Sequence, residues 1–242
     1  MMSGFSKDEL IRYSRQLMLG EIGIMGQQKI RAAKVLVVGA GGLGCPLLQY
    51  LCGAGVGAIG IVDFDTVELH NLHRQILYGS NDVGKPKAAV AAEKLKSQNP
   101  HVQLNVHETM LDEKNAEDII SAYDIVADGS DNFMTRYLVN DACVLLGKPN
   151  VYGSIFRFEG QLAVFNYKGG SNLRDIYPQP PDPEDVPNCS ETGVLGAVPG
   201  IIGTYMALNV IQVILGKTGI SDKLILFDLL GNTQTGLQLN TK

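Results

Sequence analysis

Residues Val35–Gly44 read VLVVGAGGLG, and this stretch decides the fold class. An apolar run rich in valine leads into Gly39, Gly41 and Gly44, which give the G-x-G-x-x-G spacing expected between a strand and a helix. Glycines at these positions permit a tight turn and let backbone N–H groups at the helix start approach a phosphate. Asp63 ends the next apolar run, where a carboxylate can bind the two hydroxyls of a ribose. The stretch therefore predicts a site for an adenosine compound, without specifying which one.

Apolar strands and helical stretches alternate around this turn as far as residue 153. We expect strands at 35–38, 59–62, 103–107, 124–127 and 150–153, and helices at 43–54, 84–97, 113–122 and 132–146. Such alternation indicates parallel pairing with helical crossovers. The predicted fold is therefore α/β, with a Rossmann-like, doubly wound, mainly parallel sheet.

The pattern changes after residue 153. The stretch FEGQLAVFNYKG is typical of an antiparallel strand, and KLILFDLLGNTQTGLQL is typical of a closing hairpin around Gly231 and Asn232. We therefore predict an antiparallel β-rich C-terminal extension within one domain over residues 1–242. Its expected parts are a helical arm (1–31) with a break at 20–26, a nucleotide-binding core (32–153), and a C-terminal part (154–242) with a crossover loop at 171–192.

Composition and charge exclude several classes of protein. The chain has 242 residues, of which 45% are hydrophobic and 19% are charged, and these values are ordinary for a globular protein. Its formal net charge of -5 argues against a surface that neutralises nucleic-acid phosphates. The N-terminal MMSGFSKDELIRYSRQ lacks the apolar core of a signal peptide, and the four cysteines form no CxxC pair. We expect no nucleic-acid partner and a reducing, cytoplasmic location.

The segment Gly193–Gly216, GVLGAVPGIIGTYMALNVIQVILG, holds no charged residue over a length that could cross a bilayer. Pro199, the polar Asn209 and Gln212, and several glycines divide it into a loop and a helix of moderate length. This pattern favours a buried or dimer-interface helix over a membrane span, so no membrane association is expected.

Polar and cationic residues after the second strand point to chemistry on a triphosphate. The stretch DFDTVELHNLHRQILYGSNDVGKPK leaves the carboxyl end of that strand, where ligands of open α/β sheets bind. Its candidate ligand-binding residues are Asp65, Asn71, Arg74, Gln75 and Lys87. Opening a triphosphate places negative charge on leaving oxygens and requires several cations, whereas redox chemistry on a dinucleotide does not.

A second acidic stretch, DIVADGSDN, ends with Asp131 at the start of a predicted helix. A carboxylate at this position can cap the helix or hold Mg²⁺ against phosphates, and the two roles can coexist. The sequence has no G-x-x-x-x-G-K-[ST] run, so the chain is not a P-loop NTPase.

Several motifs in this order resemble the MoeB/ThiF/HesA family, the prokaryotic relatives of ubiquitin-activating enzymes. They are RYSRQ, VLVVGAGGLGCPLLQYLCGAGVG, DFDTVELHNLHRQ, GKPK, DGSDN and EGQLAVF, and together they extend over nearly the whole chain. The resemblance implies a homodimeric adenylyltransferase that uses ATP and magnesium. Its substrate would be the C-terminal glycine, in a Gly-Gly tail, of a small ubiquitin-like sulfur-carrier protein of molybdopterin or thiamin biosynthesis, and a sulfurtransferase is a candidate further partner.

The resemblance also implies roles for single residues. Gly42 and Asp63 would hold the nucleotide, and Asp131 would bind magnesium with Asn132 beside it. The residues implied around the phosphates are Asn71, Arg74, Gln75 and Lys87. Arg15, the second arginine of RYSRQ, would reach into the site of the partner subunit. A carboxylate is already ionised at neutral pH, so its attack on the α-phosphate needs no general base.

The sequence departs from this family at its cysteines. Members commonly bind a structural zinc with two CxxC pairs, but the first pair's place holds Asn172 and Asp175, and no second pair follows. We therefore expect no structural zinc. Cys189 matches a position implicated in persulfide or thioester chemistry, so a covalent link to the carrier and a bystander thiol are both open. The remaining cysteines fit a core better: Cys45, Cys52 and Cys143.

Three other functions remain open from the sequence. The glycine turn alone permits an NAD-dependent oxidoreductase, against which the set of cations around a phosphate site argues. An enzyme that adenylates a non-protein carboxylate, such as one linked to tRNA, is disfavoured by the acidic net charge. A non-enzymatic scaffold that binds adenine nucleotide would not require the cations.

Overall fold

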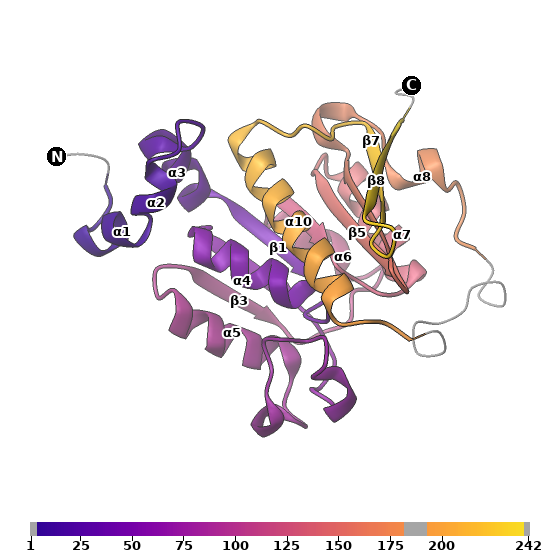
Figure 1. Cartoon of the computed structure of the whole chain (residues 1–242), viewed down its shortest axis with the longest axis horizontal. Coiled ribbons are helices and arrows are strands. Elements are labelled where there is room, and N and C mark those ends of the chain that lie inside the picture. Colours follow the sequence, from indigo (N-terminus) through magenta and orange to yellow (C-terminus); the bar gives the residue numbers. More distant parts are fainter. Residues whose placement is uncertain (1–3, 182–192, 240–242) are drawn as a thin grey trace.

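The structure is a computed structural model, and it describes residues 4–181 and 193–239. Figure 1 shows a central sheet with helices on both of its faces. The strands are β1 (Lys34–Val38), β2 (Ala58–Val62), β3 (Gln103–His107), β4 (Ile125–Asp128), β5 (Asn150–Phe156), β6 (Glu159–Phe165), β7 (Lys223–Asp228) and β8 (Thr233–Gln238). The α-helices are α1 (Lys7–Arg12), α2 (Ser14–Leu17), α3 (Gly23–Ala32), α4 (Gly44–Ala54), α5 (Lys87–Gln98), α6 (Ala116–Ser121), α7 (Phe133–Leu145), α8 (Leu173–Ile176) and α10 (Ala197–Leu215). Short 3₁₀ turns are η1 (Leu69–Asn71), η2 (Ser80–Asp82) and η3 (Tyr167–Gly169).

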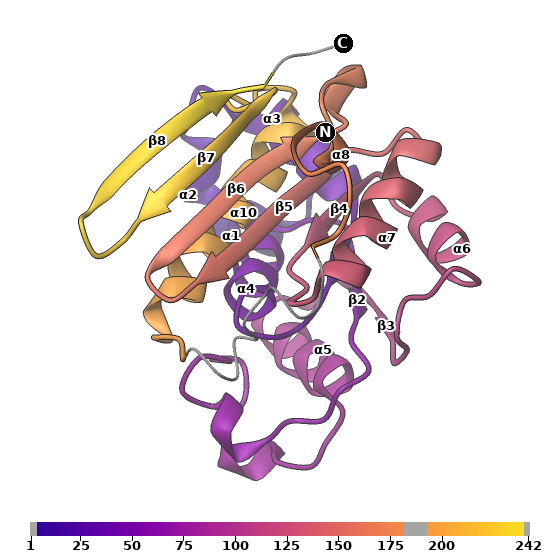
Figure 2. The ribbon, with the colours of Figure 1, turned by 90° about the vertical axis from the view of Figure 1, so that its right-hand side faces the viewer.

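The eight strands form one sheet in the order β3-β2-β1-β4-β5-β6-β7-β8. Strands β1 to β5 pair in parallel, whereas β6, β7 and β8 each pair antiparallel with their neighbours. The predicted α/β class, with a mainly parallel sheet and an antiparallel extension, is confirmed. In Figure 2 the antiparallel strands lie nearest the viewer and continue the same sheet as the parallel ones.

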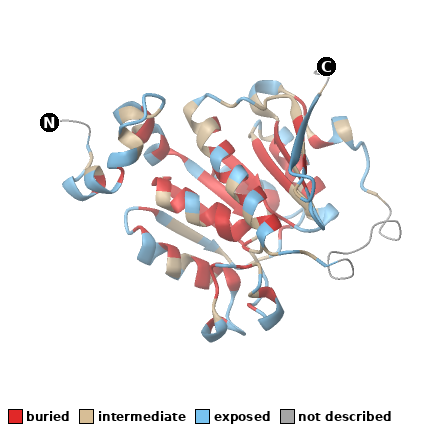
Figure 3. Ribbon diagram, viewed as in Figure 1, coloured by how far each residue is buried: buried red, intermediate tan, exposed pale blue. Residues whose placement is uncertain are grey.

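Strand β1 shows why the sheet is covered on both faces. Val35 and Val37 belong to one buried cluster with residues of α4, α5 and α10, while Leu36 and Val38 belong to another with residues of α6 and α7. Successive side chains of a strand point to opposite faces, so an unbroken apolar run requires apolar cover on each side. Figure 3 shows this burial concentrated in the central strands and on the helix sides that face them.

Helix α10 packs on α4, β5 and β6. A Cβ at Gly203 would lie 2.3 Å from the carbonyl oxygen of Leu43, so only glycine allows the two helices to approach this closely. By length and composition α10 could cross a membrane, and half of it is buried inside the protein. Its exposed side still carries large apolar side chains: Ile201, Tyr205 and Leu208.

Several element boundaries differ from the sequence-based expectation. Helix α5 begins at Lys87 rather than at residue 84, because Pro86 disfavours helical geometry in the residue before it. The expected break at 20–26 is shorter, since α3 already begins at Gly23 and packs Gly26 against Leu215. The helix expected at 113–122 covers only Ala116–Ser121.

The C-terminal half also differs in detail. Strand β5 continues to Phe156, because its last residues pair with β6, and the boundary placed between residues 153 and 154 falls inside this strand. The segment expected as the crossover loop 171–192 contains helix α8, and its residues 182–192 lie outside the described part of the chain.

The connections place two groups of elements at opposite edges of the sheet. The glycine turn after β1 and the loops after β2 and β4 lie at the carboxyl edge, because these strands are parallel. Helix α3 leads directly into the first residue of β1, so α1, α2 and α3 lie at the amino edge, as Figure 1 shows. This arrangement decides which candidate residues can meet within one chain.

Candidate functional site

The glycine turn between β1 and α4 is compact. Gly39 has a φ of +88°, and a Cβ on it would lie 2.9 Å from the carbonyl oxygen of Gly129. A Cβ at Gly44 would lie only 1.9 Å from the carbonyl oxygen of Gly39. Side chains are therefore excluded from both ends of the turn, and the open backbone between them faces the carboxyl edge.

Asp63 ties the end of β2 to this turn. Its carboxylate accepts hydrogen bonds from the backbone N–H groups of Ala40, at 2.8 Å, and Asp65, at 2.9 Å. Burial raises the pKa of Asp63 above the ordinary aspartate value, although these donors and Lys87 favour the charged form. The carboxylate therefore stands beside the glycine turn, at the place predicted for ribose recognition.

Lys87 is a buried cation at the start of α5. Its side chain is 7% exposed, and its Nζ lies 2.9 Å from Oδ2 of Asp65. The hydroxyl of Tyr78 donates to the backbone carbonyl of Ala40 at 2.8 Å and to that of Lys87 at 3.2 Å. Tyr78 thereby holds the lysine backbone against the glycine turn. Asp65 supplies the anion that a buried ammonium needs, and a cation held this close to the glycine turn suits a group that receives phosphate.

The loop after β2 brings three more candidates to the same turn. Asn71 and Gln75 are buried, and the side-chain nitrogen of Gln75 would lie 3.6 Å from a Cβ at Gly41. The aliphatic part of Arg74 would lie 3.6 Å from a Cβ at Gly42. The Arg74 guanidinium is held by the His70 carbonyl, at 3.2 Å, and by the His73 ring, at 2.9 Å.

The loop after β4 holds Asp131 at the same edge. Asn132, not Asp131, is the N-cap of α7, and its side-chain oxygen accepts from the N–H of Thr135 at 2.9 Å. The alternative in which Asp131 caps the helix is therefore wrong. Asp131 is exposed, and its carboxylate accepts no hydrogen bond from another described residue. It is available to bind a cation.

Unsatisfied polar atoms test whether this site fits a nucleotide. Among the described residues, seven buried side-chain atoms have no hydrogen-bond partner, and four of them belong to the loop after β2 or to the end of β4 and the loop that follows: Asn71 Oδ1, Gln75 Oε1, Asp128 Oδ2 and Ser130 Oγ. Leaving such an atom unpaired costs about 1–3 kcal/mol; three of the four are oxygens that accept from a donor such as a ribose hydroxyl, and the Ser130 hydroxyl can also donate to a phosphate oxygen. The residues present therefore fit a polar ligand at this edge.

The same edge fits magnesium only together with a ligand. In the described ranges, no three His, Cys, Asp or Glu side chains gather closely enough to hold a metal. Magnesium is commonly bound by one or two carboxylates plus substrate phosphates, which is the arrangement that Asp131 beside a nucleotide would offer.

Two predicted residues do not join this group. Arg15 lies on α2 at the amino edge, where it is exposed and donates to the sulfur of Met18 at 3.8 Å. Cys189 lies outside the described residues, so its predicted role stays a prediction. The other three cysteines are buried; burial raises the pKa of Cys45 to about 12 and that of Cys52 to about 11. These thiols stay protonated at neutral pH.

Sequence reasoning missed three residues that shape the site. Ser130 supplies one of the unpaired polar atoms, Tyr78 holds the turn, and Arg136 donates to the Ser130 carbonyl at 2.9 Å. Ser130 could have been found as a hydroxyl between two aspartates just after a buried strand. Arg136 lies four residues after the helix cap Asn132, and this spacing directs a side chain back toward the start of the helix. Tyr78 carries no such signal.

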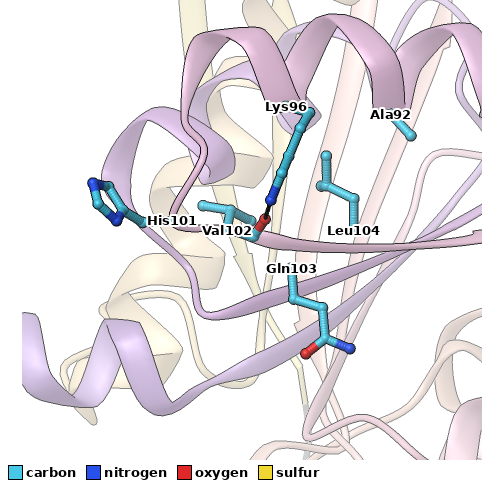
Figure 4. A pocket seen from close by; sticks show the side chains of 6 residues that line it. All are labelled: Ala92, Lys96, His101, Val102, Gln103 and Leu104. Carbon is cyan, nitrogen blue, oxygen red and sulfur yellow. Dashed lines mark hydrogen bonds between the residues drawn. The ribbon is translucent and has the colours of Figure 1, made fainter.

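A separate surface hollow of about 460 Å³ lies between the end of α5 and the start of β3, at the amino edge. Figure 4 shows Lys96 reaching across it to the backbone at Val102, and its Nζ also donates to the Pro100 carbonyl at 2.9 Å. This lysine therefore binds backbone carbonyls just after the C-terminal end of α5, and the hollow is not part of the candidate site.

Comparison with known proteins gives the family. Adenylyltransferase and sulfurtransferase MOCS3 of Culex quinquefasciatus is 53% identical over 224 residues, which are 92% of this chain and 51% of that protein. Sulfur carrier protein adenylyltransferase of Thermus thermophilus is 49% identical over 232 residues, which cover 93% of this chain and 86% of that protein. This chain thus spans about half the length of the MOCS3 relatives it matches.

The fold is shared more widely. The crystal structure of Escherichia coli MccB superimposes with a TM-score of 0.85 at 19% identity, covering 100% of this chain and 73% of that one. The ThiF family model matches residues 13–242, and the resemblance found from the motifs is confirmed. With nearly the whole chain matched, and with the glycine turn, Asp63 and the cationic loop gathered at one edge of the sheet, this protein belongs to the ThiF family.

Proposed function

We propose that this protein is an adenylyltransferase that uses ATP and Mg²⁺ to adenylate the C-terminal glycine of a small ubiquitin-like sulfur-carrier protein, releasing pyrophosphate. One observation supports this above all: two cations lie by the glycine turn, Arg74 beside Gly42 and the buried Lys87 close enough to act on Asp63. A redox dinucleotide site requires few positively charged side chains beyond those that bind its pyrophosphate. A site that opens a triphosphate needs several cations around the phosphates. The names of the relatives MOCS3 and sulfur carrier protein adenylyltransferase agree with this reading.

In this proposal each candidate residue has a task. Asp63 binds the ribose hydroxyls, and the N–H groups at the start of α4 face the phosphates. Asn71 and Gln75 donate to phosphate oxygens, while Arg74 and Lys87 offset negative charge as the α-phosphate is attacked. When bound at Asp131, Mg²⁺ supplies further positive charge against the departing pyrophosphate. The reacting carboxylate is already charged, so holding it in line and offsetting repulsion are the tasks left to the protein.

We propose that the active form is a homodimer in which Arg15 serves the site of the partner subunit. Arg15 lies at the opposite edge of the sheet from Lys87, and cannot serve its own chain's site without a rearrangement of α2. Large apolar side chains are exposed on the same N-terminal arm: Met18 at 74%, Leu19 at 51% and Met25 at 71%. Exposed apolar groups gathered in this way are typical of an interface.

A surface hollow of about 450 Å³ supports a protein as the acceptor. It lies between the β5–β6 turn, residues 193–195 and the end of β7, and its lining includes Phe158 and Leu195. Because β5 is parallel to β1, this hollow is on the same edge as the glycine turn. An extended peptide tail that crosses it would bring its terminal carboxylate toward the phosphates.

Further parts of the proposal concern metals, partners and location. We propose no structural zinc, because Asn172 and Asp175 form a reciprocal capping box at α8 in place of thiolate ligands. Elemental analysis that finds stoichiometric zinc contradicts this. A sulfurtransferase is the proposed further partner, in line with the double name of the MOCS3 relatives. The proposed location is cytoplasmic, with neither nucleic acid nor membrane as a partner.

The decisive experiment is ATP–pyrophosphate exchange with candidate carriers of the molybdopterin and thiamin pathways, each beside a version that lacks its last glycine. Exchange that needs Mg²⁺ and one intact carrier supports the proposal and identifies the pathway. Tight NAD binding without ATP binding refutes it in favour of an oxidoreductase. ATP binding without exchange on any carrier points to a non-protein carboxylate or a scaffold.

Mixed dimers test the role of Arg15. Alanine at Arg15, Arg74, Lys87 or Asp131 should each slow adenylate formation at least about tenfold, or about 1.4 kcal/mol. Arg15→Ala and Asp131→Ala subunits, each slowed in this way alone, should regain activity when mixed, because one site per mixed dimer then has both residues. A mixture as inactive as its parents contradicts action across the dimer.

A further inference from the structure

Arg136 on α7 is a buried arginine at the base of the loop after β4. The residue is 6% exposed, one guanidinium nitrogen donates to the Ser130 carbonyl at 2.9 Å, and another donates to the Tyr152 hydroxyl at 2.8 Å. Its guanidinium carbon also lies 5.2 Å from the centre of the Tyr152 ring. The guanidinium of arginine stays charged in proteins, so burying it is costly unless hydrogen bonds offset the cost. Apolar packing would avoid this cost, which suggests that these contacts have a role of their own.

The contacts of Arg136 hold Ser130 from one side, and Asp128 holds it from the other. The N–H of Ser130 donates to Oδ1 of Asp128 at 3.0 Å. Asp128 is 1% exposed; burial raises its pKa, and Arg136 is the charge that most favours its ionised form. Both backbone groups of Ser130 are thus fixed by buried polar side chains, directly before Asp131.

This loop also packs against the glycine turn. The carbonyl oxygen of Gly129 lies only 2.9 Å from where a Cβ of Gly39 would be, and Gly129 itself has the side chain of Leu43 at 3.3 Å from its own Cβ position. The loop and the turn therefore lie in close contact, and Arg136 holds the loop through the Ser130 carbonyl. The distance between Asp131 and the phosphate side of the turn is set by this arrangement.

We propose that Arg136, oriented by Tyr152, is a positioning residue that fixes the segment 129–132 so that Asp131 meets a divalent cation bound to the triphosphate. This inference rests on the proposed function. Arg136 itself touches neither nucleotide nor metal in this role. The hydroxyl of Tyr152 donates in turn to Oε1 of Gln161 at 3.4 Å, so the support extends from β6 through β5 to the loop.

Two variants test the role, with a matched control. Arg136→Lys keeps the charge beside Asp128 but cannot make both hydrogen bonds, and Tyr152→Phe removes the hydroxyl that orients the guanidinium. Tyr137→Phe is the control, because Tyr137 is also a buried tyrosine beside α8. Within the described part of the chain, its hydroxyl bonds the carbonyls of Tyr177 and Gln179 alone, away from the loop.

The first measurement is hydrogen exchange of the ligand-free protein. Both test variants should speed exchange of the backbone amides at 129–132, while the β3 amides at 103–107 keep wild-type rates. Tyr137→Phe should leave 129–132 unchanged. Wild-type exchange of this segment in Arg136→Lys overturns the proposal, because the loop would then be fixed without the arginine.

The second measurement is the affinity for ATP, by calorimetry, with and without Mg²⁺. Arg136→Lys should raise the Mg²⁺ concentration for half-maximal effect by about tenfold, the usual cost of disturbing the support of a metal ligand. Affinity without Mg²⁺ should stay at the wild-type value. Faster exchange with an unchanged Mg²⁺ requirement shows a structural role only and overturns the proposal. A wild-type protein that binds ATP equally with and without Mg²⁺ instead refutes the proposed metal-dependent function, and this result is independent of the variants.

Discussion

Replacing Gly44 by alanine should damage the glycine turn more than any other single methyl group on α4. The new Cβ would lie 1.9 Å from the carbonyl oxygen of Gly39, where contacts under 3.0 Å essentially never occur. The carbonyl or the helix must therefore move by more than about 1 Å, as overpacked sites do. Gly39 cannot turn toward Gly129, which is already in close contact, and its N–H is bonded to the Val62 carbonyl at 2.8 Å.

A second glycine of the same helix, Gly53, provides the comparison for the expected change in the free energy of unfolding. Gly44→Ala should lower the free energy of unfolding by about 1–3 kcal/mol, the usual cost of inserting a methyl group where there is no space. Gly53→Ala should raise it by up to about 1 kcal/mol, because alanine is the better helix former. Among the described residues, the one close neighbour of a Cβ at Gly53 is the end of the Gln98 side chain, at 3.3 Å.

Urea unfolding of the two variants and the wild type measures these free energies, and calorimetry with ATP measures the effect on the site. Gly44→Ala should also weaken ATP binding by more than about tenfold, or about 1.4 kcal/mol, because the N–H groups at the start of α4 move with the turn. Gly53→Ala should bind ATP as the wild type does. Equal stability of the two variants, or unchanged ATP affinity in Gly44→Ala, would refute the reasoning.

Three more predictions follow from the contacts of single side chains. Lys87→Met should keep the wild-type free energy of unfolding within about 1 kcal/mol, because the half-exposed Asp65 is then free to contact solvent. The same variant should slow pyrophosphate exchange at least about tenfold. A folded, fully active variant contradicts the role of this cation. Iodoacetamide at pH 8 should leave the buried cysteines unlabelled in the native protein, because burial raises the pKa of each thiol, and peptide mapping by mass spectrometry checks this for Cys45, Cys52 and Cys143. Arg174→Ala should cost less than about 1 kcal/mol at pH 7, because both partners of its ion pair with Asp141 are partly exposed. Hydrogen bonds from Arg174 lower the pKa of Asp141, so the ion pair's contribution to stability is present above the ordinary aspartate pKa and is lost as pH falls through the lowered pKa. A stability difference between wild type and Arg174→Ala that grows in acid would contradict this.

The alternation of strands and helices could be predicted from the sequence because it depends on local periodicity. The run at 103–107 is a strand over the expected residues, and the helices after β1 and β4 begin within one residue of expectation. Boundaries failed where distant contacts decide them. Gly26 lies inside α3 because its lack of a side chain lets Leu215 approach, and β5 extends to Phe156 because β6 pairs with it.

The candidate site was predictable where its residues follow a strand or a motif. Asp63, Lys87 and Asp131 all meet the glycine turn at one edge of the sheet, as parallel pairing requires. The sequence could not show that Asn132 rather than Asp131 caps α7, because either side chain can accept the N–H of the first turn.

What the sequence determined by itself was the class of fold and the kind of ligand, since the spacing of glycines and the placement of Asp63 are local properties of the chain. Only the tertiary structure decided which groups act together. It buried Lys87 beside Asp65, placed Arg15 at the far edge, and brought Arg136 under the loop that holds Asp131. These outcomes depend on how helices pack across the sheet, and contacts between residues distant in sequence leave no periodic pattern from which to predict them.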